Sequence, residues 1–398
     1  MKKAAVSSLD VSGRRVFVRA DFNVPLGPGG VVTDDLRIRA TLPTIRQILD
    51  RGGSVVAASH MGRPKGKPDP KASLLPCAAV LSSLLGARVE LAPGCSGPET
   101  TGMASALRPG EVLLLENLRF DPGEESNDPA FAGRLAALAD LYVNDAFGAA
   151  HRAHASVAAI CSRFDRPSAG LLMQREIDYL GRLLESPPKP YVAILGGAKV
   201  TGKIELIESL LCHVDRILIG GAMAYTFLKA RGVPVGSSLV EEEKLELARS
   251  LECKAAEAGV ELLFPSDHVL GEPGGDVPLG VSAGEQVEAG KVGFDIGPRT
   301  ATAFGSAISE ARTILWNGPM GRFEVRGFAT GTRRIASAIS EATGRGALTV
   351  VGGGDSAAAV RAFQMEAGFS HISTGGGASL EMLSGRTLPG VAALADEA

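Results

Sequence analysis

Polar and cationic side chains follow four apolar runs in the first half of the chain. They are Asp21 and Asn23 after residues 16–20, His60 and Arg63 after 54–58, Asn117 and Arg119 after 112–115, and Asp145, His151 and Arg152 after 141–144. Arg37 opens the helical stretch that follows the first run. Ligands of open parallel sheets bind beyond the carboxyl ends of the strands. Because each guanidinium can bind an anion bidentately, this rim predicts a site for a small, multiply charged anion.

Glycine-rich corners take the corresponding places in the second half. The corners are GGAK from 196, GGAM from 220, NGPMG from 317, GGGDS from 352 and GGGAS from 375, with Lys199 and Lys203 as clustered cations. Bare amides at a helix start can approach phosphate oxygens closely, so these corners predict a nucleotide-phosphate site. Asp355 offers a hard carboxylate that suits Mg²⁺. An anion site and a nucleotide site facing each other across a hinge predict phosphoryl transfer between two small molecules.

Two alternatives stay open on these residues alone. A single GG corner is equally compatible with tight strand-to-helix packing, although five such corners in one half favour a phosphate site. Gly197, Gly202 and Lys203 match the first part of a P-loop, but Ile204 stands where a hydroxyl would bind the metal. A P-loop NTPase would hydrolyse ATP without a second substrate. A non-catalytic scaffold would bind its ligands without exchanging a phosphoryl group.

Other conspicuous residues have structural interpretations. We expect His151 and His154 to hold their loop and Trp316 to lie in the core. The acidic run 241–243 is typical of a helix start. The cysteines are odd in number and form no CxxC pair, so we expect small buried thiols rather than a disulfide framework or a zinc site. They are Cys77, Cys95, Cys161, Cys212 and Cys253.

Continuously apolar runs alternate with helical stretches along the whole chain. The runs of the second half are 191–195, 216–219, 261–264, 313–316 and 348–351, and helices are expected over 35–50, 173–184 and 240–258. Continuous rather than alternating hydrophobicity indicates strands covered on both faces, joined by crossover helices. Pro187, Pro188 and Pro190 place a domain boundary after the helix that precedes them. We expect an α/β fold of two doubly wound parallel-sheet lobes joined by a hinge, over 1–185 and 186–380.

Composition excludes several classes of protein. The chain has 398 residues and 41 Lys and Arg against 44 Asp and Glu, a net charge of −3. Such a balance does not suit a nucleic-acid binder, which needs a basic surplus. No apolar run reaches the roughly 20 residues of a membrane helix, and the first residues lack a signal-peptide core. We therefore expect a cytoplasmic protein that binds neither nucleic acid nor membrane.

The ordered motifs resemble those of the phosphoglycerate kinase family over nearly the whole chain. They are RADFNVP, SHMGRP, ENLRF followed by GEE, NDAFGAAHRAHAS, GGAKV, WNGPMGRFE, VVGGGDS and STGGGASLE. The resemblance implies reversible phosphoryl transfer from 1,3-bisphosphoglycerate to ADP, giving 3-phosphoglycerate and MgATP. It also implies a glycerate-binding N-lobe, a nucleotide-binding C-lobe, and a segment 381–398 that returns to the N-lobe. We expect a monomer.

The resemblance implies roles residue by residue. The glycerate would be held by Asp21, Asn23, Arg37, His60, Arg63, Arg119 and Arg152. The catalytic groups would be Arg37, Lys199, Lys203 and Gly375. The nucleotide would contact Gly197, Lys203, Gly221, Asn317, Glu324, Gly353, Gly354, Asp355 and Ser356, with Asp355 binding Mg²⁺.

Three positions depart from the family pattern. Gly202 stands where the family often has Asp, and Ser356 replaces the usual Thr but keeps a hydroxyl. Arg322 occupies a position that is commonly small and aliphatic, so it adds a charge near the nucleotide pocket.

Overall fold

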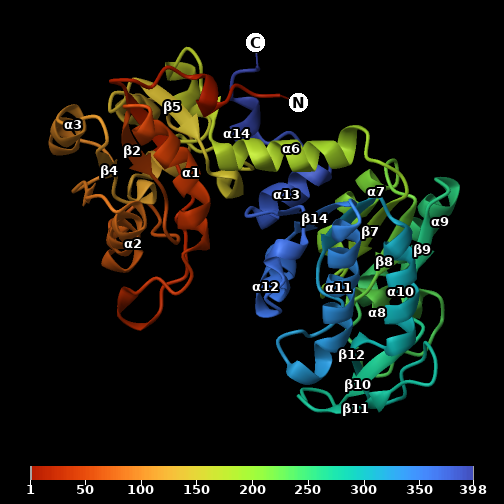
Figure 1. The fold of residues 1–398 in the computed structure, drawn as a ribbon. Helices are drawn as coiled ribbons and strands as arrows, with labels where there is room; N and C mark the ends of the chain where they lie inside the picture. The colour runs from red at the N-terminus through yellow and green to blue at the C-terminus, as the bar shows by residue number, and fades with distance from the viewer. Residues whose placement is uncertain (1, 398) are drawn as a thin grey trace. The chain divides into compact units, whose positions relative to one another are not determined.

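The computed structural model describes residues 2–397, which form two compact units (Figure 1). The first unit comprises Met1–Asp178 together with Thr387–Ala398, and the second comprises Tyr179–Arg386. Both units are built on a parallel sheet with crossover helices, which confirms the predicted α/β class. Of the described residues, no helix is both long and apolar enough to cross a membrane.

The first unit contains a parallel six-stranded sheet in the order β3-β4-β2-β1-β5-β6. The strands are β1 (Arg15–Arg19), β2 (Ser54–Ala58), β3 (Val89–Leu91), β4 (Val112–Leu114), β5 (Leu141–Asn144) and β6 (Ser168–Ala169). The four apolar runs predicted in this half all form strands. The outer strands β3 and β6 were not predicted, because β3 is only partly buried around the exposed Glu90 and β6 has two residues, so neither carries a continuous apolar run.

Helices cover this sheet, and α1 shows how the sequence places them. They are α1 (Leu36–Asp50), α2 (Leu75–Leu85), α3 (Pro98–Ser105), α4 (Pro122–Glu125), α5 (Pro129–Ala136) and α14 (Pro389–Ala392), together with the first part of α6 (Leu171–Glu185), which continues into the second unit after Asp178. In α1, Ile38, Leu42, Ile45 and Ile48 recur at helical spacing and are buried. The chain reverses after α1 at Gly52, whose φ of 79° suits glycine.

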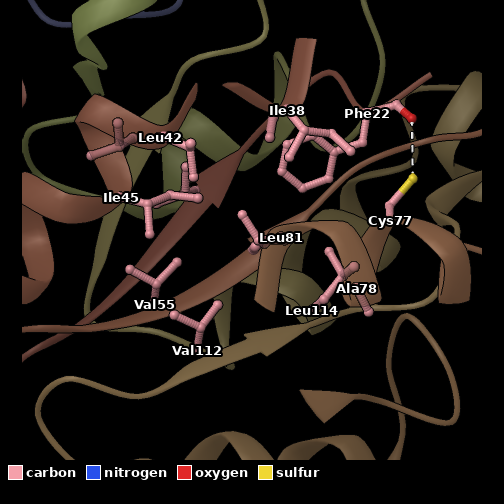
Figure 2. Packing of buried hydrophobic residues seen from close by; sticks show 14 of the residues in the cluster. Phe22, Ile38, Leu42, Ile45, Val55, Cys77, Ala78, Leu81, Val112 and Leu114 are labelled. Atoms are coloured by element: carbon pink, nitrogen blue, oxygen red, sulfur yellow. Dashed lines mark hydrogen bonds between the residues drawn. The ribbon is translucent and has the colours of Figure 1, made fainter. Parts of the chain in front are cut away.

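Figure 2 shows the core between α1, α2 and the sheet. Ile45 of α1 and Leu81 of α2 are buried in one cluster with Val55 of β2 and Val112 of β4. The Cys77 thiol donates to the carbonyl of Phe22 over 3.6 Å. This packing fixes α1, and with it the position of Arg37 in the first turn of that helix.

The second unit contains another parallel six-stranded sheet, in the order β15-β14-β13-β7-β8-β9. Its strands are β7 (Tyr191–Leu195), β8 (Arg216–Ile219), β9 (Glu261–Leu263), β13 (Thr313–Asn317), β14 (Leu348–Gly352) and β15 (His371–Ile372). Its helices are α7 (Ile204–Leu210), α8 (Met223–Ala230), α9 (Leu245–Glu257), α10 (Pro298–Glu310), α11 (Thr330–Gly344), α12 (Gly354–Ala362) and α13 (Gly376–Leu383). Trp316 is fully buried in β13, as predicted.

A small antiparallel sheet in the second unit was not predicted. It pairs β10 (His268–Gly271) with β11 (Pro278–Val281) and β12 (Val292–Ile296) in the order β11-β10-β12. Every residue of β11 is exposed, and the register shifts along β10. Polar residues and glycine interrupt β10 and β12, and β11 is exposed, so none of these strands carries a continuous apolar run and the sequence predicted only parallel strands.

The prediction that all five cysteines are buried was wrong for two of them. Cys77, Cys95 and Cys161 are buried, whereas Cys212 and Cys253 are exposed. Cys212 follows α7, and Cys253 lies on α9 beside Lys254, whose amine pairs with Glu208 over 2.5 Å. Both cysteines therefore belong to a polar surface, and a small apolar side chain is tolerated there singly.

Leu81→Ala tests the core that positions α1. Leu81 is fully buried, so its truncation leaves a cavity and is expected to lower the free energy of unfolding by about 2–5 kcal/mol. Leu75→Ala is the matched control, because Leu75 lies on the same helix and is 61% exposed. Urea denaturation measures both. Equal losses in the two variants would contradict the packing described here.

Candidate functional site

Four strands of the first unit deliver their following residues to one edge of the sheet. The strands β4, β2, β1 and β5 are hydrogen-bonded neighbours and run parallel, so their carboxyl ends lie together. The residues that follow them include Asp21, His60, Asn117 and Asp145. The residues of the predicted anion rim therefore follow neighbouring strands at one edge of the sheet.

Asp21 and Arg37 form the centre of this rim. The Arg37 Nη1 donates to both carboxylate oxygens of Asp21, at 3.1 and 3.0 Å, and to the carbonyl of Asn23 at 3.2 Å. Burial alone would raise the pKa of Asp21, but its electrostatic interactions with His60, Arg37 and Arg19 together hold this pKa below its usual value. Asp21 thus stays ionised and orients the guanidinium.

Arg19 is a fully buried arginine that the sequence analysis missed. Its Nε donates to the hydroxyl of Ser156 at 2.8 Å, and its Nη2 lies 3.2 Å from Nδ1 of His60. Its guanidinium also lies 4.0 Å from the buried carboxylate of Glu124. An arginine at the end of the otherwise apolar run RVFVR was the available signal, because a buried charge needs partners.

The two buried histidines near Arg19 are held neutral. Burial lowers the pKa of His60 far below its usual value, and Arg19 and Arg119 lower it further against the opposing effect of Asp21. Burial also lowers the pKa of His154 to about 4. Neutral His60 can accept the Arg19 hydrogen at Nδ1. These rings orient their neighbours and carry no charge at neutral pH.

Glu124 anchors the loop that carries His151 and His154. It accepts from the amide of Ser156 at 3.0 Å and from its hydroxyl at 2.6 Å, and His154 Nδ1 lies 3.8 Å away. Burial raises the pKa of Glu124, opposed by Arg19. Earlier in the same loop, Arg152 Nε contacts His151 Nε2 at 3.1 Å. This arrangement agrees with the loop-holding role predicted for His151 and His154.

The remaining predicted side chains of the rim are placed by the loop after β2. Gly62 donates its amide to Oδ1 of Asn23 at 2.9 Å, and its carbonyl accepts from Arg119 Nη1 at 2.6 Å. Arg119 is buried, Arg152 is half-buried and Arg63 is exposed. The structure thus brings Asn23, Arg37, His60 and Arg119 together around Asp21 and leaves Arg63 at the solvent side of the same loop.

In the second unit, the chain reverses its winding direction between β7 and β13. From β7 the chain adds β8 and β9 on one side, and later β13, β14 and β15 on the other. Such a switch point leaves a crevice at the carboxyl ends. A Cβ at Gly318 would overlap the carbonyl of Gly196, and one at Gly221 would overlap the amide of Gly197. These close approaches require glycine.

A cavity of about 320 Å³ lies beside this switch point. Its lining includes four predicted residues, Gly197, Gly221, Glu324 and Asp355, together with Arg322 and the apolar Leu239, Val292 and Phe294. Small-molecule sites occupy about 300–1,000 Å³ and combine apolar walls with a few polar groups. Arg322 is held at the rim by Asp276, at 2.9 Å, and lies over the ring of Phe294.

Lys203 lies half-buried at the polar end of the second-unit site. Its Nζ donates to the carbonyl of Asn317 at 3.1 Å and to the Asn317 side-chain oxygen. Burial lowers the pKa of Lys203 to about 8, opposed by the charge of Asp355. The buried Nδ2 of Asn317 has no hydrogen-bond partner among residues 2–397, and Lys199 is exposed. A cation and an unused donor therefore meet here.

Two helix N-termini lie next to each other at the ends of β14 and β15. Gly353 precedes α12 with a φ of 87°, and Gly375 precedes α13. A Cβ at Gly376 would lie 3.0 Å from the amide nitrogen of Gly354. The free amides of two adjoining helix starts favour a phosphate group. Ser356 is buried and accepts the Gly318 amide at 2.6 Å, so it also shapes the NGPMG corner.

Glu241 is a second residue whose role the sequence analysis missed. Its carboxylate accepts the amides of Val200 and Thr201 and the Thr201 hydroxyl at 2.6 Å. Glu241 therefore fixes the loop that carries Lys199, rather than acting as part of a helix-start face. The partners lie 40 residues apart in sequence, so no local pattern could have shown the contact.

Asp355 fits one kind of magnesium site. Within residues 2–397 there is no group of three His, Cys, Asp or Glu side chains that could hold a metal ion. Magnesium on a nucleotide uses one or two carboxylates and takes its other ligands from phosphates and water. The exposed Asp355 in the first turn of α12 suits that mode, and an all-protein cage does not fit.

The variant Lys203→Met tests whether the pKa of Lys203 is lowered in the folded protein. With a pKa of about 8, native Lys203 loses its proton as the pH rises through 8, while the unfolded lysine keeps it until about 10.5. The free energy of unfolding should therefore rise between pH 8 and 10 in the wild type relative to Lys203→Met. Thermal denaturation from pH 7 to 10 measures the difference. A difference independent of pH would contradict the shifted pKa.

Comparison with known proteins covers both units. Residues 6–386 match the sequence model of a family described as phosphoglycerate kinase. The phosphoglycerate kinase of Chlorobium phaeovibrioides is 53% identical over 397 residues, with 100% of each chain covered. That of Solibacter usitatus is also 53% identical and covers 99% of this chain and 100% of its own.

Solved structures of phosphoglycerate kinases also match this chain. The phosphoglycerate kinase from Coxiella burnetii superimposes with a TM-score of 0.89 at 40% identity, and 98% of each chain is covered. The enzyme from Pyrococcus horikoshii gives a TM-score of 0.85 at 32% identity, again with 98% of each chain covered.

Proposed function

Because this chain belongs to the phosphoglycerate kinase family, we propose a residue-level account of its reaction. The protein is a kinase of glycolysis that reversibly transfers a phosphoryl group from 1,3-bisphosphoglycerate to ADP, giving 3-phosphoglycerate and ATP. This activity excludes the P-loop NTPase and the non-catalytic scaffold considered above. The roles of individual residues, the metal and the motion are the proposal.

We assign the glycerate to the rim of the first unit. Arg37, fixed by Asp21, would neutralise the transferring phosphoryl group, and Arg119, Arg152 and Arg63 would bind the other charges of the substrate. Asn23 and His60 would complete the set through hydrogen bonds, because His60 is neutral. The support is that cations from separate corners meet at one sheet edge. Arg37 and Arg119 pair with Asp21 and Glu125, whereas Arg63 and Arg152 form no ion pair within residues 2–397.

We assign the nucleotide to the cavity of the second unit. The apolar end would take the base, with Gly197, Gly221 and Glu324 around the base and ribose. The phosphates would lie against Lys203, Asn317 and the helix starts at Gly353, Gly354 and Gly375. Ser356 would act through the Gly318 amide that it holds. The observation that carries this assignment is the pair of adjoining helix N-termini beside the half-buried Lys203.

The chemistry needs no general base. A terminal phosphate oxygen of ADP attacks the acyl phosphate in line, the bond from phosphorus to the acyl oxygen breaks, and its electrons leave on the carboxylate of 3-phosphoglycerate. In the reverse direction that carboxylate is already ionised at neutral pH. Arg37, Lys199, Lys203 and the Gly375 amide would align and neutralise the transferring group. Mg²⁺ bound by Asp355 and the nucleotide would add charge neutralisation.

The proposal includes a closing motion about a hinge. The anion rim and the nucleotide site belong to different units, so the two substrates must be brought together for transfer. Closure would also exclude water, which otherwise competes for the acyl phosphate. We further propose that the protein acts as a cytoplasmic monomer, with residues 1–185 as the glycerate lobe, 186–380 as the nucleotide lobe and 381–398 packed on the first lobe.

Arg37→Ala tests the catalytic assignment. The variant is expected to lose roughly 10³-fold in kcat, because a cation at the transferring group is missing, while its affinity for MgADP stays close to that of the wild type. Arg39→Ala is the matched control. Arg39 lies on the same helix and pairs with Asp35 at 2.7 Å in an exposed position, so its loss should leave turnover unchanged. Full turnover in Arg37→Ala would refute the assignment.

Small-angle X-ray scattering tests closure. The radius of gyration should fall when MgADP and 3-phosphoglycerate are added together, because only the doubly occupied protein gains contacts to the same transferring centre. Each ligand alone should cause a smaller change. A radius of gyration that is the same with and without both ligands would count against the hinge motion and leave the two binding assignments standing.

A further inference from the structure

Tyr225 and His268 form a buried pair in the second unit, and neither has been given a role above. Tyr225 lies on α8, and His268 begins β10. The Tyr225 Oη lies 3.1 Å from Nδ1 of His268, and Nε2 of His268 lies 2.9 Å from the carbonyl oxygen of Glu285. The pair therefore ties α8 to the antiparallel sheet and to the loop that contains Glu285.

The direction of this hydrogen-bond chain follows from its last acceptor. A carbonyl oxygen can only accept, so Nε2 of His268 carries the hydrogen and donates to Glu285. Burial lowers the pKa of His268, so the ring is neutral at neutral pH and Nδ1 has a free lone pair. The Tyr225 hydroxyl must then donate to Nδ1. One defined bond fixes the position of this hydroxyl.

The hydroxyl of Tyr225 lies directly behind one wall of the nucleotide cavity. The backbone of β12 passes so close that a Cβ at Gly293 would overlap Tyr225 Oη. The Gly293 amide donates to Ser238 at 3.0 Å, which holds the strand in this place. Val292, Gly293 and Phe294 line the cavity. A displacement of the hydroxyl would therefore also displace the wall formed by Val292, Gly293 and Phe294.

Tyr225 is also joined to a second part of the cavity wall. Gly221 and Ala222 line the cavity just before α8, and the Tyr225 amide donates to the carbonyl of Ala222 at 3.1 Å. One residue thus connects two parts of the cavity wall, the start of α8 and the strand β12. The walls that it connects include the apolar end, where an aromatic base would find its contacts.

We propose that Tyr225 and His268 are positioning residues that set the spacing of the cavity walls and so determine the affinity for the base of ADP. This inference rests on the proposed function, which places the nucleotide in the cavity. Neither side chain contacts the nucleotide in the proposal. They act through Gly293 and through the start of α8.

Tyr225→Phe tests the proposal by comparing two ligands. Isothermal titration calorimetry measures the dissociation constants of MgADP and of inorganic tripolyphosphate, which has no base. Removing one hydrogen bond that positions the wall should weaken MgADP roughly fivefold. Tripolyphosphate should bind as before, because its contacts are Lys203 and the helix N-termini. The KM for ADP should rise while kcat and the KM for 1,3-bisphosphoglycerate stay unchanged.

Two further variants make the test specific. His268→Gln can still donate to Glu285, but its only acceptor, Oε1, does not lie at the Nδ1 position to which Tyr225 donates. It should therefore match Tyr225→Phe, and the double variant should be no worse than either. Tyr191→Phe is the matched control. The Tyr191 hydroxyl is buried at the start of β7, at the end of the sheet remote from the cavity, and within residues 2–397 it has no hydrogen-bond partner. Its loss should leave both affinities unchanged.

The possible results separate this inference from the proposed function. Unchanged MgADP binding in Tyr225→Phe, an equal loss of both ligands, or the same loss in Tyr191→Phe would overturn the positioning role. Failure of the wild type to bind MgADP would overturn the nucleotide assignment itself. Melting temperatures confirm that each variant is folded at the titration temperature, and His268→Gln carries the test if Tyr225→Phe is not folded.

Discussion

The buried guanidinium of Arg19 is the charge on which the first unit's binding rim depends. A charge removed from water must be paired and hydrogen-bonded, and Arg19 obtains its partners from three separate loops through His60, Glu124 and Ser156. Those loops follow β2, β4 and β5, so satisfying one arginine fixes their relative positions. Asp21, two residues beyond Arg19, then orients Arg37. The ion network around Arg19 therefore also positions the residues of the proposed substrate rim.

The second unit uses close backbone approach instead of buried charge. Gly196, Gly221 and Gly318 allow three chain segments to meet where a side chain would overlap a neighbouring carbonyl or amide. The result is a surface of peptide groups with one half-buried lysine. Such a surface suits phosphates, whose oxygens accept from amides, whereas the first unit's guanidinium groups suit a compact anion with fixed charges. In the proposed assignment, the two units would thus bind their phosphate-bearing ligands by different means.

The sequence predicted the parallel sheets well, because their strands are covered on both faces and read as continuous apolar runs. It also placed the site residues at the strand ends, where the corners carry unusual residue types. It missed β10–β12, which carry no continuous apolar run, and it missed the role of Glu241, whose partners lie far away along the chain. Tyr225 and His268 look like ordinary core residues until the glycine packed on the hydroxyl is seen. Local sequence patterns show which residues are buried, whereas contacts between residues far apart in the chain can be identified only in the folded structure.

The first unit is assembled from two stretches of chain that enclose the whole of the second unit in sequence. Near its start, Ala4 donates to the carbonyl of Ala395 at 2.9 Å, and Lys3 pairs with Asp396 at 2.7 Å. On the ribosome, the opening strands must therefore wait for the final residues before the unit is complete, whereas the second unit has its entire sequence earlier. The unit whose synthesis begins first is therefore the unit that is completed last.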